Sequence, residues 1–148
     1  MAEIKVISCS VEDIREYGNN PRRNDKAIDS VLASIRKFGY INPIIVNQDN
    51  VILAGHTRLK ALKKHGQKEV EVLQLQHMTE EQEMAFRIAD NRTAEFSEWD
   101  NDLLTAEMKE ITAEDWEEFG FKPEQLRKMQ DINMCTYPKC GRTFERIK

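Results

Sequence analysis

The sequence is short of the features that would place the protein in a membrane or outside the cell. It holds only three cysteines, and Cys9 lies far from Cys135 and Cys140, so we expect thiols or metal ligands rather than a disulfide framework. No apolar run approaches the roughly 18 residues that span a bilayer, and the opening MAEIKVISCS lacks the layout of a signal peptide. We therefore expect a cytoplasmic protein without membrane contact.

Internal repeats and low-complexity segments are missing as well, which excludes a repeat array. What is present is a chain of 148 residues with 40% hydrophobic content. A chain of this size and composition supports one core domain and a small appendage.

The net charge of −4 is unevenly distributed along the chain. Residues 1–77 hold 12 basic and 9 acidic side chains, residues 78–134 hold 6 and 16, and residues 135–148 hold 4 and 1. The first part can meet phosphates, whereas the acidic middle part is unsuited to them. That acidic part is either a solvated helix surface or a face for a partner or a second copy.

The first 40 residues suggest a strand, an exposed loop and a helix. The alternation in IKVIS predicts a strand at 4–8, and GNNP at 18–21 predicts a turn that leads into a loop with Arg22 and Arg23, our candidates for DNA contact. Apolar residues then recur at helical spacing from Asp25, and Gly39 stands where a helix ends.

The next segments predict a hairpin, a helix and a strand. Two β-branched runs at 44–47 and 51–53 flank the turn-forming residues 48–50. A helix at 57–65, ended by Gly66, and a strand in VEVLQLQ follow. The order of elements predicts an α+β fold, with a small mixed sheet and helices followed by acidic C-terminal helices.

The acidic region carries the start signals of several helices. Thr79 precedes a cluster of carboxylates, which suits the N-terminus of a helix that runs to about Phe96. Asp100 or Asn101 can cap a second helix through Ile111, and Thr112 or Pro123 can open short ones. We therefore predict three regions: an α/β core at 1–78, an acidic helical region at 79–131 and a tail at 132–148.

The stretch VILAGHTRLKALKKHG suggests an anion site. A glycine between a strand and a helix lets the backbone approach a ligand, and the first helical turn offers free N–H groups at its positive end. Arg58 adds a bidentate phosphate donor, and His56 is a candidate general base or metal ligand. The alternatives are an ordinary tight turn with a surface arginine, and a histidine that only bonds within the turn.

The tail, MCTYPKCGRTFERIK, holds half of a zinc-site pattern. Cys135 and Cys140 are separated by four residues and resemble the first half of a zinc finger or zinc ribbon. Two ligands do not close a tetrahedral site. The site is completed by a second copy of the chain in a symmetric homodimer or by other ligands, or the cysteines form an empty reduced pair.

Three motifs together resemble the ParB N-terminal domain of the ParB and sulfiredoxin superfamily. They are NPR at 20–22, GYINPIIV at 39–46 and ILAGHTRLKA at 52–61, and the resemblance covers roughly residues 4–100. The segment RIADNRTAEFSEWDNDLL at 87–104 further resembles the branch found in phages and mobile elements, often beside DNA methyltransferases.

The resemblance implies a nucleotide site. Family members hold the phosphates of CTP or ATP, with Mg²⁺, against a GERR-like loop, whose first and last positions match Gly55 and Arg58. His56 and Thr57, between them, depart from that pattern. The resemblance also implies nucleotide contacts from a second loop, at Gly39, Asn42 and Pro43, and from a third motif, at Asp90, Asn91 and Arg92, with Asp90 a candidate for metal binding or catalysis.

The departures from the family pattern point away from two functions. Sulfiredoxin needs a cysteine in the loop where this chain has His56, so it should not be a sulfiredoxin. The residues after Asp100 are too few and too acidic for a helix-turn-helix domain, so sequence-specific DNA reading by this chain alone is not expected.

Three functions remain open. The first is a nucleotide-binding module that associates with DNA directly or through a partner. The second is an enzyme, either a metal-dependent nuclease or a CTPase or ATPase. The third is an accessory protein of a DNA methyltransferase.

Overall fold

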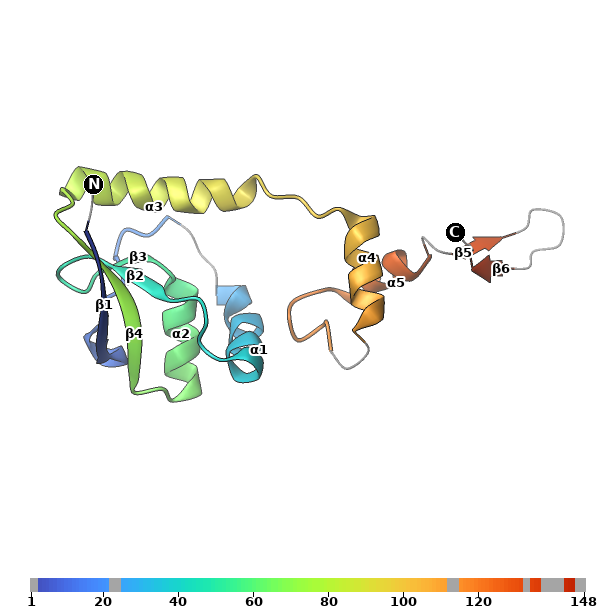
Figure 1. Ribbon diagram of the computed structural model, residues 1–148, viewed down its shortest axis with the longest axis horizontal. Coiled ribbons are helices and arrows are strands. Elements are labelled where there is room, and N and C mark those ends of the chain that lie inside the picture. The colour runs from blue at the N-terminus through green and yellow to red at the C-terminus, as the bar shows by residue number, and fades with distance from the viewer. Residues whose placement is uncertain (1–2, 22–24, 112–114, 132–133, 137–142, 146–148) are drawn as a thin grey trace. The chain divides into compact units, whose positions relative to one another are not determined.

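The computed structural model describes residues 3–21, 25–111, 115–131, 134–136 and 143–145, with side chains through Arg127. The chain divides into two compact units, Met1–Ser97 and Glu98–Lys148, which are described separately (Figure 1). None of the helices in the described residues is long and apolar enough to cross a membrane.

The first unit is built on a four-stranded mixed sheet. Its strands are β1 (Glu3–Ser10), β2 (Ile44–Val46), β3 (Ile52–Ala54) and β4 (Glu69–Gln76), in the order β1-β4-β2-β3. β4 pairs antiparallel with β1 and parallel with β2, and β2 pairs antiparallel with β3 as the expected hairpin. The predicted α+β fold with a small mixed sheet is therefore confirmed.

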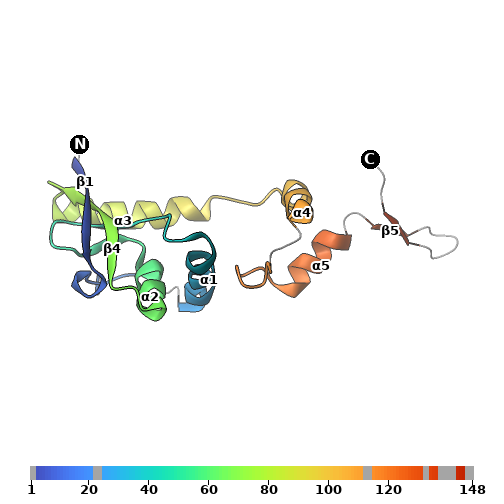
Figure 2. The ribbon, with the colours of Figure 1, turned by 60° about the horizontal axis from the view of Figure 1, so that its bottom comes forward.

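Three helices cover the two faces of this sheet. Figures 1 and 2 show α1 (Ile28–Phe38) and α2 (His56–His65) on one side and α3 (Glu80–Glu95) on the other. Short 3-10 helices at Val11–Asp13 and Asp25–Ala27 precede α1. The core between the sheet and α2 consists of fully buried aliphatic side chains: Val11, Ile14, Ile44, Val46, Ile52, Leu59, Leu62, Val70 and Val72.

The lysines of α2 are paired with acids that come before them in the chain. Lys60 Nζ lies 2.7 Å from Asp25 and 4.0 Å from Glu16, and Lys64 Nζ lies 2.5 Å from Asp29. The Asp25 contact raises the pKa of Lys60. These acids belong to α1 and the segment before it, and exposed pairs of this kind contribute little to stability.

The second unit contains α4 (Asn101–Glu110), α5 (Pro123–Asp131), β5 (Met134–Thr136) and β6 (Thr143–Glu145), the last two paired antiparallel. Asp100 caps α4 by accepting bonds from the N–H groups of Asp102 and Leu103. Aromatic rings gather beside these helices: Phe121 lies 6.1 Å from Trp99 and 6.2 Å from Trp116 between ring centroids. Trp116 is half-buried among these rings, whereas Trp99 is 68% exposed.

Candidate anion-binding site

Gly55 forms the N-terminal cap of α2 in a conformation that favours glycine. Its φ is 106°, in the left-handed region. A Cβ at this position would lie 3.2 Å from the Arg58 guanidinium carbon and 3.3 Å from Ile44 Cγ1, closer than side chains normally approach. Any other residue at 55 would therefore be strained by its backbone and crowded by Arg58.

Arg58 ties the helix to the preceding loop. Its Nη1 donates to the main-chain carbonyl of Asn42 at 3.0 Å, to the Asn42 side-chain oxygen at 3.1 Å and to the Pro43 carbonyl. The predicted nucleotide residues Asn42, Pro43, Gly55 and Arg58 are thus brought together, although they come from two segments of the chain. Thr57 lies beside them in the first turn of α2, half-buried.

The loop before β2 is fixed at both of its ends. Gly39 ends α1 with a φ of 86° and donates its N–H to the Ile35 carbonyl. Tyr40 folds back so that its hydroxyl accepts the N–H of Ile44 at 2.6 Å. These bonds hold the chain between the two residues in position to present the Asn42 and Pro43 carbonyls to Arg58.

The position of the Arg58 guanidinium is electrostatically unusual. It lies over Gly55, at the positive end of α2, where a helix disfavours cations and attracts anions. Burial lowers the pKa of Arg58, and the charges of Tyr40 and Asp90 act in the opposite direction. A cation held there by carbonyl oxygens leaves a positive field at the helix N-terminus, which an anion would neutralise.

The third predicted segment lies on α3. Asp90 is exposed, and its charge acts on Arg58, which places this segment on the same side as the anion site. Asn91 donates its amide to the Arg87 carbonyl at 2.8 Å, within the helix. Arg92 pairs with Glu95 at 2.5 Å and lies 4.6 Å above the Phe96 ring, so it is engaged along α3.

His56 is held by the main chain of a distant segment. Its Nε2 accepts the N–H of Tyr17 at 3.3 Å, which requires the proton of the neutral ring to sit on Nδ1. Burial lowers the pKa of His56 below its usual value of 6.5; the negative charge of Glu16 opposes this shift, and the positive charges of Arg87 and Lys60 add to it. The bond links the start of α2 to the segment after β1 and does not lie within the turn at Gly55.

Acidification should therefore weaken the fold through His56. The unfolded chain takes up the proton near pH 6.5, whereas the folded protein resists it, so the contribution of His56 is complete above about pH 6.5 and is lost as the pH falls through the lower folded pKa. We expect His56→Gln, which keeps an acceptor but does not titrate, to flatten the stability curve between about pH 7 and pH 5. Urea unfolding of both proteins across this range measures the effect, and parallel curves would contradict it.

Sequence reasoning missed a buried polar network that attaches α3 to the sheet. Arg87 is 6% exposed, donates to the Ile52 carbonyl at 3.1 Å and to Glu83 at 3.2 Å, and lies 3.9 Å above the Tyr17 ring. Glu83 in turn accepts both contacts from the Asn47 amide, at 3.0 and 3.1 Å. The i,i+4 spacing of Glu83 and Arg87 was the available signal, but that spacing is equally typical of a solvated helix surface.

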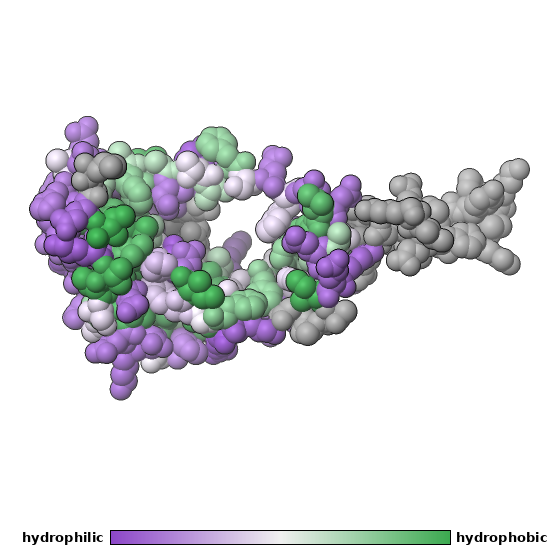
Figure 3. Space-filling view, viewed as in Figure 1, coloured by the Kyte–Doolittle hydropathy of each residue, from purple (hydrophilic) through white to green (hydrophobic). Residues whose placement is uncertain are grey.

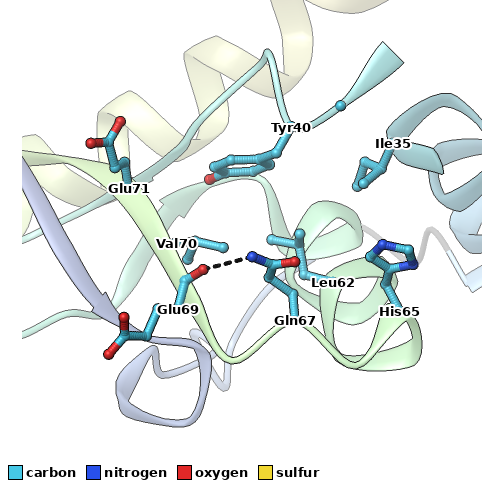
Figure 4. Close-up of a pocket in the computed structure, with 9 residues that line it drawn as sticks. Ile35, Tyr40, Leu62, His65, Gln67, Glu69, Val70 and Glu71 are labelled. Carbon is cyan, nitrogen blue, oxygen red and sulfur yellow. Dashed lines mark hydrogen bonds between the residues drawn. The ribbon is translucent and has the colours of Figure 1, made fainter. Parts of the chain in front are cut away.

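A cavity lies between the C-terminal end of α2 and the loop before β2. It has a volume of about 310 Å³ and is bounded by the Tyr40 ring, His65 and Gln67, over a floor of Ile35, Leu62 and Val70 (Figure 4). Gln67 donates its amide to the Glu69 carbonyl at 3.0 Å on one side of it. Gly39 also lines the cavity, which therefore adjoins the loop before β2 that belongs to the predicted nucleotide site.

Several predicted sites lie outside the described residues. Arg22 and Arg23 do so, and so does Cys140; Cys135 lies in β5, where only the backbone is described. Within the part of the chain that the structure describes, no three His, Cys, Asp or Glu side chains gather as they would around a metal ion. The DNA-contact and zinc predictions therefore remain predictions.

Comparison with known proteins identifies the first unit. A family model described as the ParB N-terminal domain matches residues 1–92. The ParB-like nuclease domain-containing protein YnaK of Escherichia coli is 27% identical over 81 residues, which cover 54% of this chain and 93% of YnaK. The probable chromosome-partitioning protein ParB of Campylobacter jejuni is 44% identical over 65 residues, but these cover 40% of this chain and only 23% of that protein.

Solved structures show the same fold. The C-terminally truncated chromosome-partitioning protein ParB of Caulobacter crescentus, complexed with CTP-γ-S, superposes with a TM-score of 0.64 at 17% identity, covering 86% of this chain and 78% of that one. A pNOB8-like ParB N-domain superposes with a TM-score of 0.53 at 18% identity, covering 98% of this chain and 58% of that one.

Proposed function

Since the chain belongs to the ParB N-terminal domain family, we propose that it binds a nucleoside triphosphate, CTP or ATP, at the turn from Gly55 to Arg58. The phosphates would lie against the first turn of α2, and Asp90 would help to hold a Mg²⁺ ion that neutralises their charge. The loop Gly39–Pro43 and Asn91 and Arg92 of α3 would form the remaining walls.

The observation that carries this proposal is the placement of Arg58. Its guanidinium lies over Gly55, at the positive end of α2. Its bonds to Asn42 and Pro43 are made by Nη1. Arginine has five N–H donors, and phosphate accepts them in pairs. A CTP analogue is bound in the Caulobacter ParB structure, which supports a nucleotide as the anion.

Nucleotide binding would serve an association with DNA. The match to the probable chromosome-partitioning protein ParB of Campylobacter jejuni, 44% identical over 65 residues, supports a role beside DNA for this chain. We propose that contact is made either through the loop that carries Arg22 and Arg23 or through a partner, in phage or mobile-element DNA transactions. A DNA methyltransferase is one such partner, and zinc bound by Cys135 and Cys140 of two chains is one route to a homodimer.

Calorimetric titration with CTP, ATP and GTP, each with and without Mg²⁺, tests the proposed ligand. We expect saturable heat for CTP or ATP that increases with Mg²⁺, because the metal screens the phosphates from each other and from Asp90. The control is the same titration with cytidine and adenosine, which lack phosphates and should bind far more weakly. Absence of heat for all three triphosphates would overturn the proposal and favour an accessory protein without a ligand of its own.

The second candidate is a metal-dependent nuclease or nucleotide hydrolase. The observation in its favour is the nuclease domain named in YnaK, of which this chain covers almost the whole length. Incubating plasmid DNA and, separately, the bound nucleotide with the protein and Mg²⁺ or Mn²⁺ distinguishes the functions. Nicking of DNA that is lost when Asp90 is replaced would favour the nuclease. Release of phosphate from the nucleotide would favour the hydrolase.

A further inference from the structure

The two edges of the sheet differ in whether another segment of the first unit covers them. The edge at β3 is covered: Ile52 donates its N–H to the Arg15 carbonyl at 2.9 Å, and Arg15 donates to the Asn50 carbonyl at 2.9 Å. The opposite edge is β1, and among the residues that the structure describes β4 is its only neighbour in the sheet. An uncovered edge strand presents main-chain donors and acceptors to any strand that meets it.

A hydrogen bond just after β1 shows which main-chain N–H and C=O groups of the strand point toward β4. Val11 donates its N–H to the Lys68 carbonyl beside β4, and the groups alternate along a strand. The odd-numbered residues of β1 therefore face β4, and the even-numbered residues Ile4, Val6, Ser8 and Ser10 face outward.

The side chains on the outer part of this strand are apolar and exposed. Ile4 is 62% exposed and Val6 is 66% exposed. Ile7 and Cys9 pack against the core on the side of α1 and α2, so Ile4 and Val6 lie on the opposite face of the sheet. Figure 3 shows hydrophobic side chains open at the surface over β1. Edge strands are normally kept apart by charges, prolines or bulges, and here the one basic side chain, Lys5, lies on the other face.

We propose that two copies of the chain pair through their β1 strands, antiparallel about a two-fold axis, to form a continuous eight-stranded sheet. Because the β3 edges are covered, this pairing uses both open edges and closes at a dimer. The occupant is a second copy because the strand is complementary to itself in one register.

That register places Val6 opposite Val6 of the second copy. Ile4 then faces Ser8, Lys5 faces Ile7 and Glu3 faces Cys9, so no two like charges meet and the lysine stem covers an aliphatic side chain. A shift that centres the axis on Lys5 brings two lysines together, and one that centres it on Ile7 places Val6 against a serine. Centring on Val6 therefore gathers the exposed apolar side chains of both copies.

Sedimentation over a roughly hundredfold range of protein concentration tests the dimer, with circular dichroism to show that each variant folds. The wild type should be dimeric at the upper concentrations. In Val6→Lys two lysines would meet at the axis, so the dimer dissociation constant should rise on the order of a hundredfold. The matched control is Ile88→Lys, which changes a side chain of 64% exposure on α3 and should leave the dimer intact.

A charge pair tests the register. Val6→Lys and Val6→Glu should each be monomeric alone, and an equimolar mixture should form a heterodimer, because lysine then faces glutamate across the axis. A wild type that stays monomeric at every concentration would overturn the proposal. The β1 edge would then pair with a different segment or with another protein. A dimer that survives Val6→Lys, or one that Ile88→Lys abolishes, would place the interface elsewhere and overturn it as well.

Discussion

Replacing Arg87 by alanine is expected to destabilise the first unit by about 3 kcal/mol or more, the cost of breaking a buried ion pair. The change leaves the Glu83 carboxylate, 15% exposed, without its cation, and it frees the Ile52 carbonyl and the face of Tyr17. Denaturant unfolding followed by far-ultraviolet circular dichroism measures the loss, which is a large part of the stability of an ordinary domain.

Arg92→Ala is the matched control for this measurement. Arg92 lies on the same helix and pairs with Glu95, but its side chain is 63% exposed, compared with 7% for Arg87. Exposed pairs contribute about 0–1 kcal/mol, so this variant should unfold close to the wild type. Equal losses in the two variants would show that α3 is held by something other than the Arg87 network.

Replacing Arg58 by alanine should affect both binding and stability. The change removes charge-assisted bonds to the Asn42 and Pro43 carbonyls, which are worth about 1.5–3 kcal/mol, so the loop before β2 should loosen. If the guanidinium also contacts a phosphate, nucleotide affinity should fall about tenfold to a hundredfold. Calorimetry and denaturant unfolding on the same samples separate the two effects.

Arg58→Lys distinguishes charge from geometry. Lysine keeps the positive charge near Gly55 but cannot reproduce the planar fork that reaches several oxygens at once. We expect it to retain part of the nucleotide affinity and little of the loop contact. A folded Arg58→Ala protein with unchanged affinity would assign Arg58 to structure alone.

The elements of the first unit could be read from local signals. Helix α1 ends at Gly39 because the positive φ of 86° there suits glycine, and α3 begins after Thr79, whose hydroxyl and Gln82 form the capping box. The Gly55–Arg58 turn was identified as the candidate site for the same reason: a glycine, a helix start and an arginine are adjacent in sequence.

What could not be read depends on contacts between distant segments. Arg58 was expected to point at a ligand, but its bonds to Asn42 and Pro43 depend on how the loop before β2 returns to α2. The charge distribution predicted that α3 belongs with the acidic helices. The burial of Arg87 against β3 depends instead on contacts with Tyr17 and Asn47 that sequence charge does not reveal. Periodicity and composition carry no information about such pairings.

The division of the aromatic residues between the two units offers a natural optical probe. Both tryptophans, Trp99 and Trp116, lie in the unit Glu98–Lys148, whereas Met1–Ser97 contains tyrosines but no tryptophan. Fluorescence excited selectively at tryptophan therefore reports on the second unit alone. A change in that emission when a nucleotide is added to the first unit would reveal communication between the two units, without any label attached to the protein.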